Sequence, residues 1–217
     1  MRFNMRYILV ILIFCFTMFS CKELNSNGEV EGTETPSSLH PLDYIKYIEN
    51  PKNGLNITKS EGLNDYQLQF KTAEYMIAKS EEKVELEKSF VQKEKKEFGN
   101  VSYFTLKIKT NSGEQDILKE GVSSAEEFGG RVAYFSFFMQ QDLFLVRDKD
   151  TTPCSIFHFE RTYGIAPYCT VLFGFENKDN KNEGCQILYS DRLFSKKILS
   201  FNLLEESLKK IPRLITK

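Results

Sequence analysis

The residues of this chain that could do chemistry gather around His158. In the segment Cys154-Ser-Ile-Phe-His158-Phe-Glu160, a thiol, an imidazole and a carboxylate are separated by even numbers of residues. On an extended strand the three side chains would therefore share one face. His158 and Glu160 would lie about 6.6 Å apart along that strand, as a base and carboxylate pair could. Cys154 would lie about 13 Å from His158, too far for all three to bind one metal ion. We favour the simpler interpretation that Phe157 and Phe159 enter the core while His158 bonds a neighbour.

Two predicted loops carry oxygen ligands of the kind that bind calcium. Asp148 and Asp150 flank a lysine, and a second loop before Gly184 contains Asn177, Asp179, Asn180 and Asn182. Lysines interrupt both groups, and the complete spacing of a calcium loop is absent, so ordinary turns are the better interpretation. We therefore expect no metal site and no cofactor.

The sequence contains no G-x-S-x-G elbow, no H-E-x-x-H pair, no phosphate loop and no G-x-G-x-x-G turn. A histidine-dependent mechanism would consequently depend on His158 alone. Glycosidase chemistry needs only two carboxylates, and the 30 acidic residues neither support it nor exclude it. Catalytic residues therefore stay unknown, with His158 and Glu160 as the candidates.

Three cysteines fall in the predicted domain, and an odd number leaves at least one unpaired. If the strand that starts at Cys154 folds back on the next one with Glu160 opposite Cys169, the two thiols lie roughly 20 Å apart. Cys185, expected at the other edge of that strand pair, is also too far from Cys154 for a disulfide. We predict three buried free thiols.

Hydrophobic periodicity predicts the elements that position these residues. Helices are predicted at 41–49, 72–98, 124–134 and 203–211; strands are predicted at 55–59, 66–70, 101–109, 154–161, 168–176, 184–189 and 197–202, with 135–147 extended. Runs of consecutive strands with helices kept apart from them predict an α+β domain, with a mainly antiparallel sheet and a few covering helices.

The N-terminal residues differ from the rest of the chain. Arg2 and Arg6 precede an apolar run from Tyr7 to Phe19, and this composition predicts a secretory signal peptide over residues 1–20. As a helix the apolar run would reach only about 20 Å, short of the roughly 30 Å hydrocarbon core of a bilayer. We therefore expect export rather than a permanent membrane span.

Residues 21–41 are rich in Ser, Asn, Gly, Glu and Thr, which predicts a solvated tether. Residues 42–217 then have the length of a single globular domain. Removal of residues 1–20 takes away two of the 29 basic residues and none of the 30 acidic ones, leaving a net charge of −3. This balance argues against a nucleic-acid partner.

The segment Phe16-Thr17-Met18-Phe19-Ser20-Cys21 resembles the lipobox of bacterial lipoproteins, in which an apolar residue and a small residue precede the cysteine. The resemblance implies that Cys21 receives acyl chains such as palmitate and becomes the mature N-terminus. The membrane would then be a partner through this lipid. Because Lys22 rather than aspartate follows the cysteine, the resemblance implies the outer membrane, facing either the periplasm or the cell surface.

Three further segments resemble a family of uncharacterised lipoproteins from Gram-negative bacteria. They are Tyr47-Ile-Glu-Asn-Pro-Lys-Asn-Gly-Leu55, Tyr66-Gln-Leu-Gln-Phe-Lys-Thr-Ala-Glu-Tyr75 and Phe157-His-Phe-Glu-Arg-Thr-Tyr-Gly-Ile-Ala-Pro-Tyr168. This resemblance implies no activity and no site residues.

The sequence therefore favours a lipid-anchored protein of the cell envelope that acts as a binding or assembly module, with an envelope protein as the candidate partner. The alternatives are an envelope-anchored hydrolase that acts on envelope polymers through its carboxylates or through His158 and Glu160, and a carrier of a small ligand.

Overall fold

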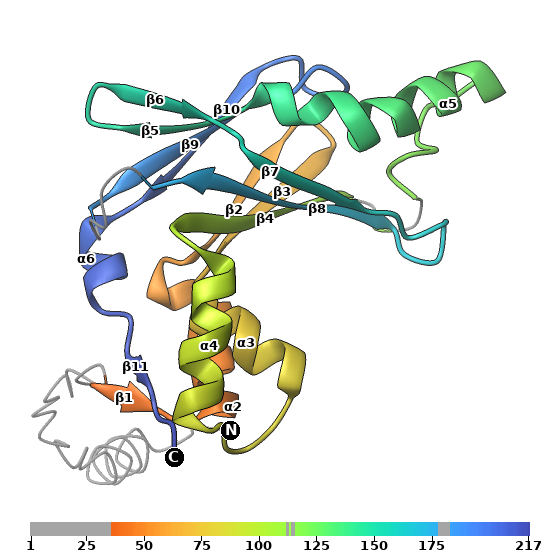
Figure 1. Ribbon diagram of the computed structural model, residues 1–217. Helices are drawn as coiled ribbons and strands as arrows, with labels where there is room; N and C mark the ends of the chain where they lie inside the picture. The colour runs from red at the N-terminus through yellow and green to blue at the C-terminus, as the bar shows by residue number, and fades with distance from the viewer. Residues whose placement is uncertain (1–35, 112, 114–115, 178–182) are drawn as a thin grey trace, which may run out of the picture. The chain divides into compact units, whose positions relative to one another are not determined.

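The computed structural model describes residues 36–217, apart from 112, 114–115 and 178–182 (Figure 1). The chain divides into two units, Met1–Glu34 and Thr35–Lys217, and all described residues belong to the second. The predicted signal peptide and the predicted lipidation at Cys21 lie outside the described residues.

Two antiparallel sheets form the centre of the second unit. The five-stranded sheet has the order β2 (Asn56–Glu61), β3 (Asn64–Lys71), β4 (Val101–Thr110), β8 (Tyr168–Glu176), β7 (Ile156–Glu160); the four-stranded sheet has the order β10 (Ile198–Leu203), β9 (Cys185–Ser190), β5 (Leu143–Arg147), β6 (Asp150–Pro153). A short parallel pair joins β1 (Ser38–Leu39) to β11 (Arg213–Leu214).

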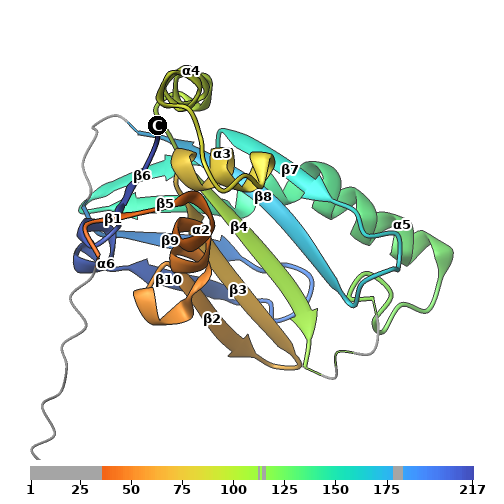
Figure 2. The same ribbon diagram turned by 90° about the horizontal axis from the view of Figure 1, so that it is seen from below.

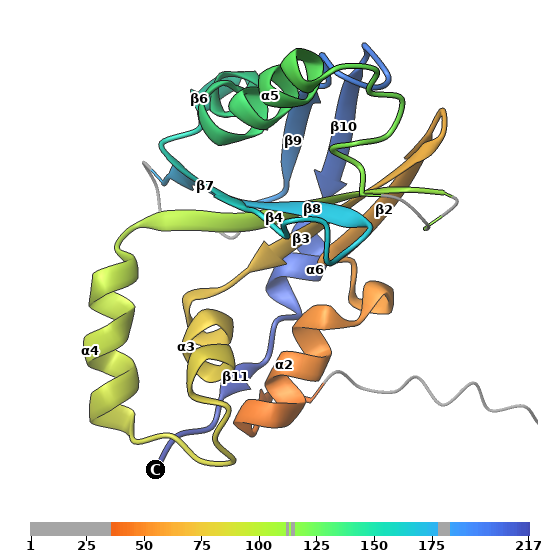
Figure 3. The same ribbon diagram turned by 90° about the vertical axis from the view of Figure 1, so that its right-hand side faces the viewer.

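The helices and helical turns lie around the two sheets. They are α2 (Pro41–Glu49), the 3-10 turn η1 (Pro51–Asn53), α3 (Ala73–Glu81), α4 (Lys88–Phe98), α5 (Ala125–Ala133), the π-helix η2 (Tyr134–Phe138), the 3-10 helix η3 (Met139–Asp142) and α6 (Glu205–Lys209). Figure 3 shows α2, α3 and α4 below the five-stranded sheet, with the four-stranded sheet and α5 above it. The predicted α+β class with mainly antiparallel sheets is confirmed.

The core fills the space between the two sheets, where alternate residues of each strand point inward. Phe104 of β4 is fully buried, and its ring centroid lies 5.7 Å from that of Phe173 and 5.9 Å from that of Phe175. Ile187 and Phe201 of the other sheet belong to the same buried cluster. The phenylalanine-rich composition therefore serves this interior.

Several predicted elements are confirmed. The strand around Leu68 is β3 and pairs with β2 as a hairpin, and the first helix begins at Pro41. Ser124 caps α5, because its hydroxyl accepts a hydrogen bond from the Glu127 amide at 3.1 Å. The Glu127 carboxylate accepts hydrogen bonds from Ser123 rather than from Ser124, so only half of the expected capping box is formed.

Two predicted elements were wrong in part. The helix predicted over 72–98 is interrupted after α3, where Glu82 adopts a left-handed conformation with φ +50°. The segment 135–147 is extended only over β5, because the chain first forms the π-helix η2 and the turn η3. Phe135 and Met139 are four residues apart and both fully buried, which is a helical spacing that the aromatic-rich sequence concealed.

The predicted positions of the cysteines were wrong in two respects: the register of one strand pair, and the sheet to which Cys185 belongs. Glu160 lies opposite Thr170, one residue from the predicted register. Cys185 begins β9, which belongs to the other sheet and pairs with β10 and β5. The prediction of free thiols is confirmed, although Cys185 is half-buried while Cys154 and Cys169 are buried.

The ordered domain begins before residue 42, the predicted end of the tether. Ser37 and Leu39 accept backbone hydrogen bonds from Arg213 and Ile215, at 3.0 and 2.8 Å. The parallel pair β1–β11 thus joins the start of the domain to the end of the chain. Among the residues that the structure describes, no helix is both long and apolar enough to cross a bilayer.

Candidate functional site

The five-stranded sheet turns a polar face away from the four-stranded sheet, because the residues between its inward-facing apolar ones are mostly hydrophilic. Cross-strand pairing arranges this face in rows. One row contains Asn56, Gln69, Thr105, Leu172 and His158, and the next contains Thr58, Gln67, Lys107, Thr170 and Glu160. We call these two rows the polar sheet face. Figure 2, seen from below, shows α2, α3 and α4 over one end of the sheet and the other end of β3, β4 and β8 open.

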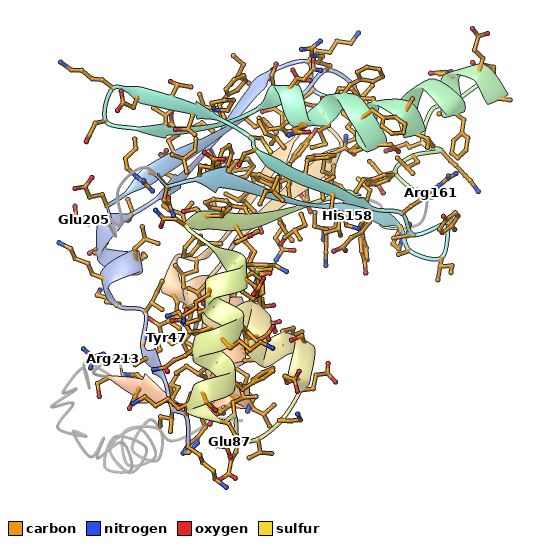
Figure 4. The ribbon with its side chains drawn as sticks, in the orientation of Figure 1. Tyr47, Glu87, His158, Arg161, Glu205 and Arg213 are labelled. Atoms are coloured by element: carbon orange, nitrogen blue, oxygen red, sulfur yellow. The ribbon has the colours of Figure 1, made fainter. Side chains whose placement is uncertain are left out.

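The structure places both sequence candidates, His158 and Glu160, on this face. They are exposed, whereas Phe157 and Phe159 between and before them pack against the core, as the simpler interpretation predicted. The ring of Phe159 stacks on that of Phe135 at 5.4 Å. His158 forms no hydrogen bond with any described residue, so the expected neighbour is not found. Figure 4 shows His158 and Arg161 at the β7–β8 side of the sheet.

The prediction that Cys154 shares a face with His158 was wrong. Cys154 lies before β7, where the chain crosses between the sheets: its amide donates to Leu143 and the next amide, of Ser155, donates to Gly174. Its thiol is buried and donates to the Ile156 carbonyl at 3.0 Å. Burial raises the pKa of this thiol to about 11, which disfavours the reactive thiolate.

The predicted oxygen-ligand loops do not form a metal site in the described part of the chain. Asp148 lies in the tight turn between β5 and β6 with φ +52°, and Asp150 begins β6, so this segment is an ordinary hairpin turn. Most of the second loop, residues 178–182, lies outside the described residues. Within the described ranges no three His, Cys, Asp or Glu side chains are placed to hold a metal ion.

A hollow of about 330 Å³ opens in the polar sheet face beside the C-terminal end of α2. Its lining comes from α2 and four neighbouring strands, and consists of Glu49, Asn56, Gln67, Gln69, Thr105, Lys107 and Thr170. We call it the polar hollow. Glu160 lies one strand from Thr170, and neighbouring strands are separated by about 4.8 Å, so the β7 candidates flank the hollow.

Several polar groups of the hollow have no partner within the described part of the protein. Thr105 and Thr170 are each only 8% exposed, yet neither hydroxyl is hydrogen-bonded there. The Gln69 Nε2 atom is buried without a hydrogen bond of normal geometry, and its amide interacts with the Tyr75 hydroxyl, which opposes the rise in the pKa of Tyr75. The two threonine hydroxyls line the hollow and are therefore suited to bind water or a ligand.

The charges around the hollow differ in how far the protein compensates them. The Glu49 carboxylate accepts hydrogen bonds from Tyr75 at 2.8 Å and from Lys79 at 3.1 Å. Lys107 forms no ion pair with a described residue; its ammonium lies 4.4 Å from the centre of the Tyr168 ring. The hollow therefore offers one uncompensated positive charge among neutral donors and acceptors.

Lys71 lies on the same face, nearer to the helices, with its ammonium 5.3 Å from the centre of the Tyr75 ring. Burial lowers the pKa of Lys71, and the nearby carboxylates of Glu160 and Glu49 oppose this shift in part. Glu160 thus interacts electrostatically with Lys71 on the helical side of the face.

A second group of ionisable residues, which no sequence pattern singled out, is buried in the protein. Asp191 accepts hydrogen bonds from the Tyr66 hydroxyl at 2.6 Å and from the backbone amides of residues 193–195. Burial opposes its ionisation, but these hydrogen bonds outweigh the burial and lower the pKa of Asp191. The detectable signal was an aspartate directly after a strand, the usual beginning of a side-chain-stabilised turn.

Asp142 is the other buried carboxylate of this group. It accepts hydrogen bonds from the Tyr134 hydroxyl at 2.9 Å and from two nitrogens of the Arg192 guanidinium at 2.8 and 2.5 Å. Because both carboxylates have several donors, we assign them to structure rather than to chemistry on a ligand. Asp191 ties the two sheets together through Tyr66, and Asp142 ties η2 to the turn after β9.

No protein-family model, curated protein or solved structure matches this chain. The fold and the site define its class only as an α+β protein with an open, polar sheet face. Any functional argument must therefore come from this chain's own residues.

Proposed function

We propose that this protein is a lipid-anchored binding module of a bacterial cell envelope, attached to the outer membrane through Cys21. The polar hollow is its ligand-binding surface. The lipobox-like segment Phe16–Cys21 supports the anchor, and the unpartnered groups of the hollow support the binding role.

The observation that carries the binding role is the pair of hydroxyls at Thr105 and Thr170, which line the hollow and form no hydrogen bond with a described residue. These side chains are neutral donors and acceptors rather than an activated nucleophile or a hydrogen-bonded acid and base. They are held on a sheet whose spacing is fixed by backbone pairing, so they lose little freedom when a ligand binds. This arrangement favours recognition over catalysis.

The anchor would act by raising the local concentration of the domain. Seventeen residue steps separate Cys21 from Ser38, so the connecting chain can span at most roughly 60 Å. Each buried CH₂ group of an acyl chain contributes about 0.8 kcal/mol, and more than one chain is needed for stable retention. A domain held in this way would sample ligands at the membrane surface continuously.

The test of the anchor is the substitution Cys21→Ala in the full chain, expressed in a Gram-negative host. Intact mass and membrane fractionation of the wild type should show acyl chains on a mature protein that begins at Cys21, recovered with the outer membrane. The variant should carry no lipid and should leave the outer-membrane fraction. Cys15→Ala is the matched control, because it removes a cysteine from the predicted signal peptide and should leave processing intact. A wild-type protein without lipid would refute the anchor.

A further inference from the structure

We infer that the polar hollow binds an acidic sugar, that is, a polyhydroxylated ring that carries one carboxylate. This inference rests on the proposed binding role of the hollow and names its ligand class. The juxtaposition that carries it is the Lys107 ammonium, which has no ion pair with a described residue, beside the hydroxyls of Thr105 and Thr170, which form no hydrogen bond with one.

The neutral groups of the hollow match the chemistry of sugar hydroxyls. A hydroxyl both donates and accepts hydrogen bonds, as do the side chains of Thr105 and Thr170. The Gln67 amide donates to Asn56 Oδ1 at 2.9 Å, and this hydrogen bond between the two rows holds both amides in a defined orientation. A ligand that carries several hydroxyls at ring spacing can therefore satisfy threonines and amides from adjacent strands, which lie about 4.8 Å apart.

The charge of the hollow selects an acidic ring over a neutral one. Glu49 already has donors in Tyr75 and Lys79, so its charge is compensated within the protein. Lys107 has only the Tyr168 ring as a partner among the described residues, so a ligand carboxylate would be its first ion-pair partner there. A positively charged ligand would instead place a second positive charge beside the Lys107 ammonium.

The size of the hollow limits the ligand to a small unit. A volume of about 330 Å³ lies at the lower end of the range for small-molecule sites, about 300 to 1,000 Å³. The uncovered part of the sheet continues from Thr170 across β8 to β7, so further units of a polymer can extend towards Glu160 and His158. One acidic sugar within a longer glycan fits this geometry.

The first experiment compares three small probes by saturation-transfer NMR and by titration of the full-length protein. The probes are D-glucuronate, D-glucose, which lacks the carboxylate, and acetate, which lacks the ring. We expect glucuronate to bind about 5- to 10-fold more tightly than glucose, the effect of one charge-assisted contact, and acetate not to saturate. Equal binding of glucuronate and glucose, or no binding of either, would overturn the inference.

Variants then assign the binding to the hollow. Lys107→Met should abolish the preference for glucuronate over glucose. Thr170→Val should lower the affinity for both sugars about 3- to 10-fold, because it removes one hydroxyl. Lys109→Met is the matched control, since Lys109 lies two residues along the same strand and face but pairs with Asp65 at 3.5 Å. Thermal unfolding checks that all variants are folded, and a Lys107→Met effect no larger than that of Lys109→Met would overturn the inference.

Acidic sugars occur in both lipopolysaccharide and peptidoglycan preparations, so a last comparison identifies the source. The wild type and Lys107→Met are co-sedimented with peptidoglycan sacculi and, separately, with lipopolysaccharide-containing vesicles, with free glucuronate as competitor. Loss of co-sedimentation in the variant identifies the preparation that supplies the ligand, and wild-type binding to neither preparation contradicts an envelope glycan.

The Cys21→Ala protein separates the two proposals. If it still binds glucuronate but the wild type carries no lipid, only the anchor fails. If the wild type is lipidated but binds no acidic sugar, only this inference fails.

Discussion

At the scale of single residues, the buried carboxylate Asp191 shows how the protein holds a charge in its interior. Five donors surround it: three backbone amides of the turn that follows β9, and the hydroxyls of Tyr66 and, at 3.4 Å, Tyr189. Each donor is fixed by structure, so the ion is stabilised without a cationic partner. The Tyr66 hydroxyl that completes the set comes from β3, in the other sheet, and this one residue therefore ties the two sheets together.

We predict that Asp191→Asn destabilises the protein by about 2 to 4 kcal/mol at neutral pH, because an amide cannot accept from all five donors and leaves some of them buried without partners. Asp150→Asn, at an exposed position, is the control and should change the free energy of unfolding by less than about 0.5 kcal/mol. Urea unfolding followed by circular dichroism measures both.

Asp191 also makes the free energy of unfolding depend on pH. The pKa of Asp191 is lower in the folded protein than in the unfolded chain, so its contribution to stability is fully present above the unfolded value of about 3.9 and is lost as the pH falls through the folded value. The gap in unfolding free energy between the wild type and Asp191→Asn should therefore narrow below about pH 4. A gap that stays constant from pH 7 to pH 3 would show that Asp191 is not ionised in the folded protein.

At the scale of elements, the π-helix η2 decides how α5 joins the core. Its wider turn directs Phe135 inward, where the ring lies against Phe159 and Phe194, while Phe137 and Phe138 point to solvent. Such a turn seldom occurs except where packing or function requires it. Here the turn lets Phe135 pack both against Phe194, which follows β9 of the four-stranded sheet, and against Phe159 of β7, the strand that carries His158.

We predict that Phe135→Ala lowers the unfolding free energy by about 3 to 5 kcal/mol, because the fully buried ring leaves a cavity. Phe137→Ala is the matched control in the same π-helix; this side chain is 72% exposed, and its loss should change stability by less than about 0.5 kcal/mol. Equal effects of the two substitutions on the thermal midpoint would contradict the inward orientation of Phe135.

At the scale of the whole molecule, the two sheets and their covering helices enclose the thiols to different depths. Cys154 and Cys169 are buried, and Cys185 is half-buried beside Arg147. Burial raises the pKa of all three thiols, and the rise is largest for Cys169, which lies near the beginning of β8. None of the three should act as an exposed nucleophile in the folded protein.

We predict that a thiol reagent such as dithionitrobenzoate modifies the native mature protein slowly, with Cys185 reacting first, and that all three thiols react within seconds in guanidinium chloride. Cys185→Ser should remove the faster native phase, and Cys169→Ser should leave that phase unchanged. Fewer than three reactive thiols after unfolding without reductant would reveal a disulfide and contradict the free thiols.

The local pattern of the sequence determined the class of fold and the inner and outer faces of single strands. Alternation along β3 and around His158 predicted which side chains enter the core, because a strand's side chains alternate whatever it pairs with. The boundary errors arose where helical and extended spacing look alike, as in the aromatic run that became η2.

Only the tertiary structure decided which strands lie side by side. Lys107 meets Thr170 and Gln67 from strands far apart in the sequence, and Arg192 reaches Asp142 across 50 residues. No local periodicity specifies such partners, since pairing depends on long-range packing of whole strands after loop closure. The polar hollow therefore exists only in the folded chain, whereas the lipobox-like segment Phe16–Cys21 can be recognised from the sequence alone.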